Sequence, residues 1–121
     1  MLDTGALIAF ERRKRRVLAL LDTAVATGLD VRTPAAVVGE FWRGDHRPDA
    51  RELLEAITVA DTLELARRAG EALAAVRHVD SVVDALVAAL ASQAGDRIVT
   101  SDPEDLSALA HWFGRLRVLA V

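Results

Sequence analysis

Apolar residues recur along the chain with two different spacings. Val17, Leu20 and Leu21 follow the period of a helix, whereas residues 97–100 and 116–121 form short strand-like runs. Helical and strand-like segments therefore alternate. The helices are expected over residues 13–27, 34–43, 62–76, 81–94 and 103–113, with shorter helical stretches at 4–10 and 50–57, and the strands over residues 29–33, 57–60, 97–100 and 116–121.

This alternation predicts an α/β fold with a parallel sheet, because parallel neighbours need long connections between them. Several residues mark the expected helix ends. Gly28 and Gly95 are predicted C-terminal stops. Thr33 is a predicted N-cap with Pro34 at the first helical position, and Asp80 is a predicted N-cap of the helix that follows it. Open parallel sheets bind ligands beyond the carboxyl ends of their strands, so the residues that follow each strand matter most for function.

Composition narrows the class of protein. The 121 residues are 52% hydrophobic and 27% charged, which fits one folded domain over residues 1–121. There is no cysteine, which excludes disulfides, thiolate metal sites and a cysteine nucleophile. The uncharged run at residues 85–94 is half of what a membrane span of about twenty residues needs. Asp3 stands where a secretory signal would be basic, so a cytoplasmic protein without membrane contact is expected.

Charge is unevenly distributed. The chain has 15 basic and 18 acidic residues, yet residues 11–16, which read ERRKRR, contribute five basic residues and one acid. The remainder is therefore clearly acidic. A basic stripe on an acidic body could place an anion beside a carboxylate site, although net charge alone does not indicate nucleic-acid binding.

Four carboxylates fall where they could share one edge of the sheet. Asp3 and Asp102 each follow a strand-like segment and precede a helix. Asp84 is the one charge in the apolar run 82–91, a pattern typical of a buried helix. Glu40 lies about two turns into its helix, on the side of small and apolar residues. Each has a plain structural alternative: a helix cap for Asp3 and Asp102, an arginine partner or an edge position for Asp84, and a surface position for Glu40.

Together the four acids predict a site for a divalent cation. Adjacent carboxylates repel one another, and several would stay protonated at neutral pH without a counter-charge. Mg²⁺ or Mn²⁺, which prefer oxygen ligands, would relieve this repulsion. A bound cation could then orient a phosphodiester and generate hydroxide from water. Neither cysteine nor histidine is needed for this chemistry.

Four segments in order resemble those of PIN-domain ribonucleases, and in particular the VapC-like toxins of toxin–antitoxin pairs. They are LDTGALIAF at 2–10, TPAAVVGEFWRG at 33–44, VVDALVAALA at 82–91 and IVTSDPEDL at 98–106. The resemblance implies a three-layer α/β/α sandwich around a parallel sheet of about five strands. It also implies Mg²⁺- or Mn²⁺-dependent RNA cleavage, a homodimer, and a cognate antitoxin that covers the site.

The resemblance also assigns residues. It implies that Asp3, Glu40, Asp84 and Asp102 form the acidic quartet. It implies supporting roles for Thr4, Thr100 and Asp105, of which Asp105 is alternatively only the partner of a helix cap. Two features depart from the family pattern. Only Met1 and Leu2 precede Asp3, so the first strand is expected to be truncated or to start upstream, and Ser81 stands where some relatives carry an acid.

The remaining charged and aromatic residues have open interpretations. Arg12, Arg13 and Arg43 are candidate RNA contacts, since arginine suits bidentate phosphate recognition, and Arg47 is a further candidate near Glu40. For the basic stripe the alternative is a solvated face. Core or dimer packing is expected for Trp42, Trp112 and Phe113, and surface positions are expected for His46, His78 and His111.

Other enzyme classes fit less well. A receiver domain and a HAD-type phosphatase both need a late lysine beside the acids, whereas the one lysine here is Lys14. A Rossmann nucleotide binder needs a glycine-rich first turn, which is absent. The serious alternative is a degenerate PIN-like module that binds a protein or RNA without cleaving it.

Overall fold

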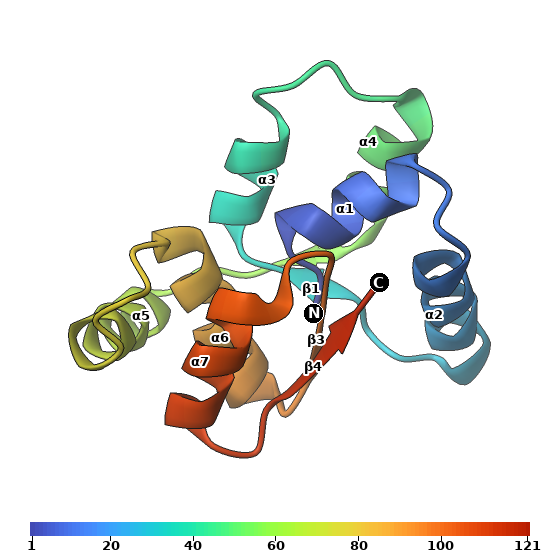
Figure 1. Cartoon of the computed structure of the whole chain (residues 1–121). Coiled ribbons are helices and arrows are strands. Elements are labelled where there is room, and N and C mark those ends of the chain that lie inside the picture. The colour runs from blue at the N-terminus through green and yellow to red at the C-terminus, as the bar shows by residue number, and fades with distance from the viewer.

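The computed structural model describes all residues from 1 to 121 and shows seven helices among four short strands (Figure 1). The helices are α1 (Thr4–Glu11), α2 (Arg15–Thr27), α3 (Ala35–Phe41), α4 (Pro48–Ala56), α5 (Leu63–Ala75), α6 (Val82–Ala94) and α7 (Pro103–Phe113). The strands are β1 (Arg32–Thr33), β2 (Thr58–Val59), β3 (Arg97–Thr100) and β4 (Arg117–Ala120). The predicted alternation of helices and strands is confirmed.

The strands form two parallel pairs. In the first pair β1 lies beside β2, with Arg32 opposite Thr58, and in the second β3 lies beside β4, with Arg97 opposite Arg117. The parallel pairing predicted from the connections is therefore confirmed. Each strand of the first pair is only two residues long.

Residues 1–3 run between these two pairs and connect them. The Leu2 N–H donates to the Arg32 carbonyl at 2.9 Å on one side, and the Val99 N–H donates to the Met1 carbonyl at 2.9 Å on the other. Leu2 forms a parallel bridge with Val99, but this segment forms no strand of its own. The structure thus shows two two-stranded sheets joined by one extended segment, and it does not show a continuous sheet of about five strands.

Thr33 has a different role from the predicted one. The N-cap position of α3 is Pro34, and the Thr33 hydroxyl instead donates to the Leu2 carbonyl at 3.0 Å. Pro34 has no N–H to offer to that carbonyl. The fully buried Thr33 side chain therefore supplies the hydrogen bond that the backbone of the next residue cannot supply.

Helix α6 lies in the centre of the apolar core. Residues Ala85 and Val87–Ala91 are buried, and α6 packs against α3, α5, α7 and β3. Figure 1 shows α5, α6 and α7 together on one side of the strands, with α1, α2 and α4 on the other. The prediction that residues 82–91 form a buried helix is confirmed, because a helix that is apolar nearly all round needs neighbours on several sides.

The helix ends are partly as predicted. Gly28 and Gly95 end α2 and α6 in the left-handed conformation, with φ of 66° and 69°, as expected. The prediction for Asp80 is wrong, because the N-cap of α6 is Ser81, whose hydroxyl accepts a hydrogen bond from the Asp84 N–H. The basic stripe separates two helices: Arg13 has a φ of 54°, and α2 begins only at Arg15.

The predictions for the aromatic and histidine side chains agree with the structure only in part. Phe113 packs against the core as expected, whereas Trp42 and Trp112 are exposed, so for these two residues only the dimer-packing alternative stays a prediction. His46 is half-buried and hydrogen-bonded, whereas His78 and His111 are on the surface as expected. No helix of the structure combines the length and the apolar composition that crossing a lipid bilayer requires.

The hydrogen bond from Thr33 generates a stability prediction. Thr33→Val keeps the shape of the side chain but leaves the buried Leu2 carbonyl without a donor. We expect the free energy of unfolding to fall by about 1–2 kcal/mol. The measurement is urea denaturation followed by circular dichroism. Thr58→Val, at an exposed position on the paired strand, is the control and should change stability by less than about 0.5 kcal/mol. Equal effects of both substitutions would contradict the role given to Thr33.

Candidate active site

Asp3 and Asp102 leave the sheet at the same edge. Residues 1–3 run parallel to β3, and the Asp3 N–H lies 3.4 Å from the Val99 carbonyl. Asp3 is the N-cap residue of α1, and Asp102 is the N-cap residue of α7, which follows β3. Because parallel neighbours present their carboxyl ends together, both acids emerge beside one another in the fold.

Gly5 permits the close approach of these two chain segments. A Cβ atom at this position would lie 2.5 Å from the Ser101 Oγ and 3.0 Å from the Ser101 nitrogen. Any other residue would require the Ser101 side chain to rotate away and the two backbones to move apart by a few tenths of an ångström. The glycine in the segment LDTGALIAF thus brings Asp3 toward the turn that carries Asp102.

Asp3 is held in place and largely removed from water. Its Oδ1 accepts a hydrogen bond from the Ala6 N–H at 2.6 Å, and only 5% of the residue is exposed. Burial raises the pKa of the Asp3 carboxyl to about 6. The nearby Thr100 hydroxyl and the hydrogen bond from the Ala6 N–H oppose this rise, and the nearby charge of Asp84 adds to it.

Asp84 stands among the other acids. It lies in the first turn of the buried helix α6, with its own N–H bonded to the Ser81 hydroxyl at 3.1 Å. Burial raises the pKa of Asp84, and the Ser81 hydroxyl opposes the rise. Three further carboxylates, from α3 and from the start of α7, also raise it: Asp105, Glu40 and Asp102. The negative charge of Asp84 therefore lies close enough to interact with the other three acids of the predicted quartet.

Glu40 is tied to the start of α1. It occupies the last turn of α3, is half-buried, and accepts a hydrogen bond on Oε2 from the Thr4 hydroxyl. Thr4 follows Asp3 directly, so this bond fixes Glu40 relative to the first acid. An unattached surface position for Glu40, the alternative left open by the sequence, does not agree with this contact.

Thr100 and Asp102 form a small turn at the end of β3. The buried Thr100 hydroxyl accepts from the Asp102 N–H at 2.9 Å and donates to the Asp102 carbonyl at 3.1 Å. The Asp102 carboxylate makes no capping hydrogen bond, although the residue occupies the N-cap position. A capping role does not account for this side chain, which is exposed to solvent and free to bind another group.

Comparison with known families identifies the chain. The family described as "PIN domain" matches residues 1–111. The chain belongs to the PIN-domain family. The match includes all four acids, ends within α7 and does not reach β4. No curated protein was found to match the chain.

PIN domains are α/β proteins and are generally metal-dependent nucleases, so membership indicates nuclease-type chemistry here. Two observations bear on whether these residues suit a metal ion. The donors are all oxygen atoms, and the raised pKa values of Asp3 and Asp84 show that added positive charge would be favourable. However, no three acidic or histidine side chains are close enough together to hold an ion as the structure stands. The donor chemistry fits a hard cation, and the side chains would have to converge on it.

The candidate RNA-binding arginines of this PIN domain differ in their surroundings. Arg13 pairs with Asp49 and lies over the Phe10 ring, while Arg12 is exposed at the end of α1. Arg43 is exposed and has no carboxylate within ion-pair distance. It follows α3 and lines a cavity of about 630 Å³ that also contains Thr4 and Glu40. Arg43 is thus the one of the three that is both unpaired and next to an acid.

A second cavity, of about 600 Å³, lies at the opposite end of the strands. Met1, Gly95 and Arg97 line it together with apolar residues of α2, and it contains none of the four acids. It is therefore separate from the candidate site.

Sequence reasoning missed one feature beside the site. His46 bonds through Nδ1 to Glu11 at 2.9 Å and through Nε2 to the Phe41 carbonyl. The two side chains are 35 positions apart, and neither belongs to a spacing pattern that indicates a contact.

The pKa of Asp3 generates a prediction about stability and pH. Because the pKa rises from 3.8 to about 6 on folding, the folded protein binds more protons than the unfolded chain between these values. Stability from this group is therefore highest at low pH and falls as the pH rises through about 6, by about 3 kcal/mol in total. In Asp3→Asn the side-chain oxygen can still cap α1, but the charge is absent. Without metal, we expect the variant to be more stable than the wild type at neutral pH.

Urea denaturation in a chelating buffer tests this expectation. The stabilisation by Asp3→Asn should be about 1–3 kcal/mol near neutral pH and should shrink toward zero near pH 4. Asp22→Asn, at an exposed position on α2, is the matched control and should show no pH-dependent difference. A destabilised Asp3→Asn protein at neutral pH would show that the negative charge is compensated in the apo fold.

Proposed function

We propose that this chain is a metal-dependent ribonuclease that hydrolyses RNA phosphodiester bonds and acts as the toxin of a toxin–antitoxin pair. The observation that carries the proposal is the position of Asp84 in a PIN-family chain. It is half-buried on the central helix and is coupled electrostatically to Asp3, Glu40 and Asp102, which come from three other elements. A fold that gathers such charge without a cationic partner gains from binding a divalent cation.

In this proposal Asp3, Glu40, Asp84 and Asp102 hold Mg²⁺ or Mn²⁺. When bound, the cation supplies positive charge opposite the phosphodiester and makes water more acidic. The residues of the chain position this site. Thr4 donates to Glu40 Oε2 and leaves Oε1 free, while Thr100 shapes the turn that presents Asp102. Asp84, in the first turn of α6, would hold the cation from the buried side of the site.

The supporting residues follow from the same contacts. Asp105 lies in the first turn of α7 and raises the pKa of Asp84, which supports a role for it beyond helix capping. Arg12, Arg13 and Arg43 are proposed RNA contacts on the surface beside α1 and α3. Arginine binds phosphate through two parallel hydrogen bonds, which would position the RNA backbone at the acids.

We also propose the partners and the finer fold that the four motif segments imply. Residues 1–121 would form a single PIN-like domain, with residues 1–3 as the short central strand of a five-stranded sheet between helical layers. A homodimer is supported by exposed apolar side chains, among them Val59, Leu63 and Val82. The motif resemblance supports a cognate antitoxin and a cytoplasmic RNA substrate.

One observation favours a second candidate, a degenerate PIN-like module that binds a partner without cleaving RNA. The acids do not converge as a group of three in this structure. In such a module the acids would remain as remnants, and a cation would bind weakly or not at all. Cleavage and metal binding therefore have to be tested separately.

Substitution of the acids tests the ribonuclease. Asp84→Asn and Asp3→Asn each remove one negative charge while keeping the side-chain shape. We expect each to slow the cleavage of a labelled RNA in Mg²⁺ or Mn²⁺ by about 100-fold or more, because each removes a charge directed at the reacting group. Asp22→Asn is the matched control and should cleave at the wild-type rate. Undiminished metal-dependent cleavage by both site variants would refute the assignment.

Thermal unfolding with and without Mn²⁺ distinguishes the two candidates. A ligand that binds only the folded state stabilises it, so the ribonuclease should melt several degrees higher in excess Mn²⁺. Asp84→Asn should lose most of this increase, and Asp22→Asn should keep it. A wild-type protein whose melting temperature does not respond to Mn²⁺ would favour the module.

A further inference from the structure

The cavity beside Glu40 contains one of the four acids of the candidate active site; Asp3, Asp84 and Asp102 do not line it. It has a volume of about 630 Å³ and is lined by residues of α1, α3 and the loop after α3. The lining residues are Thr4, Ile8, Glu40, Phe41, Arg43, Gly44 and His46. Thr4 and Glu40 belong to both places and are hydrogen-bonded to each other. A ligand in the cavity would therefore lie next to one of the proposed catalytic carboxylates.

Arg43 gives this cavity a free positive charge. The neighbouring arginines are neutralised: Arg13 and Arg47 pair with Asp49, and Arg51 lies 3.9 Å from Asp45. Arg43 has no such partner, and its side chain is exposed. An unpaired guanidinium beside a carboxylate site is suited to a phosphate, which it can bind with two hydrogen bonds.

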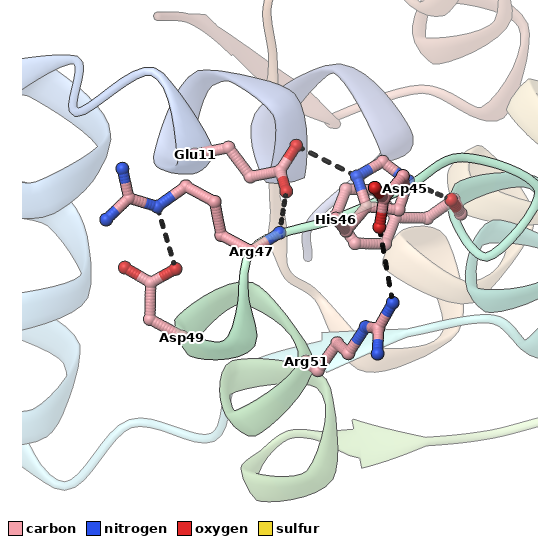
Figure 2. Close-up of polar contacts among 7 residues, drawn as sticks. Glu11, Asp45, His46, Arg47, Asp49 and Arg51 are labelled. Carbon is pink, nitrogen blue, oxygen red and sulfur yellow. Dashed lines mark hydrogen bonds and ion pairs between the residues drawn. The ribbon is translucent and has the colours of Figure 1, made fainter.

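His46 lines the cavity and is hydrogen-bonded to Glu11 (Figure 2). Its ring stacks on Phe41 with centroids 3.6 Å apart, its Nδ1 lies 2.9 Å from Glu11 Oε2, and its Nε2 faces the Phe41 carbonyl. Glu11 also accepts a hydrogen bond from the Arg47 N–H at 2.9 Å. Glu11, at the end of α1, thus contacts both His46 and the Arg47 N–H. Both belong to the loop of residues 42–47, which also contains Arg43.

Gly44 shows how closely the loop folds around the histidine ring. A Cβ atom there would lie 2.6 Å from His46 Nε2 and 2.9 Å from Cε1. The His46 side chain is only 14% exposed and is held on both ring nitrogens, so it has little room to move. The position of Arg43 therefore depends on the contact between Glu11 and His46.

We propose that this cavity binds one nucleotide of the RNA substrate, next to the scissile phosphate. This inference rests on the proposed ribonuclease function. Arg43 contacts a phosphate and Ile8 supplies apolar surface for the base, and Thr4 and Gly44 line the same cavity. Glu11 and His46 are positioning residues. The volume falls in the range of about 300–1,000 Å³ that is usual for small-molecule pockets.

Kinetics of Arg43→Gln test the phosphate contact. With a labelled single-stranded RNA of mixed sequence, we expect KM to rise about tenfold and kcat to stay within about twofold, because the lost contact is made in the ground state and in the transition state alike. Arg117→Gln is the matched control, since Arg117 is exposed, has no ion-pair partner and lies at the start of β4. An unchanged KM in Arg43→Gln would overturn the proposal.

A binding experiment separates failure of the subsite from failure of the ribonuclease. The four ribonucleoside 5′-monophosphates are titrated in a chelating buffer, and amide chemical shifts are followed by NMR. We expect saturable shifts at Thr4 and Gly44 that disappear in Arg43→Gln and persist in Arg117→Gln. If these shifts occur but the protein cleaves no RNA, the proposed ribonuclease function is refuted and the proposed nucleotide-binding site is supported. Cleavage without any shift at Gly44 would refute the subsite alone.

The positioning role of His46 has its own test. His46→Ala should raise KM as Arg43→Gln does, whereas His46→Gln, which keeps a hydrogen-bonding side chain, should restore most of the affinity. A purely structural role would instead lower the folded fraction and leave KM unchanged. His111→Gln, at an exposed position near the end of α7, is the control. A wild-type KM in folded His46→Ala would overturn this part of the proposal.

Discussion

The extended segment of residues 1–3, hydrogen-bonded on both sides, is the contact on which the candidate site depends. Leu2 bonds to the strand Arg32–Thr33, and Met1 bonds to Val99 in the second strand pair. The two pairs have no other bridge between them, so this segment sets their relative position. It also places Asp3 at the same edge of the strands as Asp102, which follows β3. The buried Thr33 hydroxyl donates a further hydrogen bond to the Leu2 carbonyl, because Pro34 has no N–H that could do so.

The electrostatics of the site work against the stability of the metal-free fold. Asp3 is nearly inaccessible and Asp84 half-buried, and burial disfavours the charged form of both. No arginine or lysine pairs with either carboxylate. A fold that only needed stability would place an apolar residue or an ion pair at these positions. Unpaired charge retained in a PIN-domain chain is the physical reason to expect a cation there.

Beside the acids, a loop rather than a strand or helix shapes the surface that RNA would meet. Residues 42–47 connect α3 to α4, and the contacts of Glu11 and His46 hold them against α1. Arg13, Arg47 and Arg51 near this loop lie within ion-pair distance of acids, whereas Arg43, beside Glu40, has no such partner. A rigidly held loop with one free charge is suited to orient a substrate without contributing to the chemistry.

Local pattern in the sequence was sufficient to predict most of the helices and strands and to propose the four acids, whereas tertiary structure decided how these acids lie relative to one another. The helical spacing, the glycine stops at 28 and 95 and the strand before Asp102 are short-range properties, and they agree with the structure. The Ser81 cap, the Thr33 bond to Leu2 and the contact of Glu11 with His46 were not foreseen, because each depends on which hydrogen-bonding partner folding brings close. Residue type alone indicates that carboxylates favour a divalent cation. The burial that raises the pKa of Asp3, and the distances that keep the four acids from closing on an ion, exist only once α1, α3, α6 and α7 are packed together.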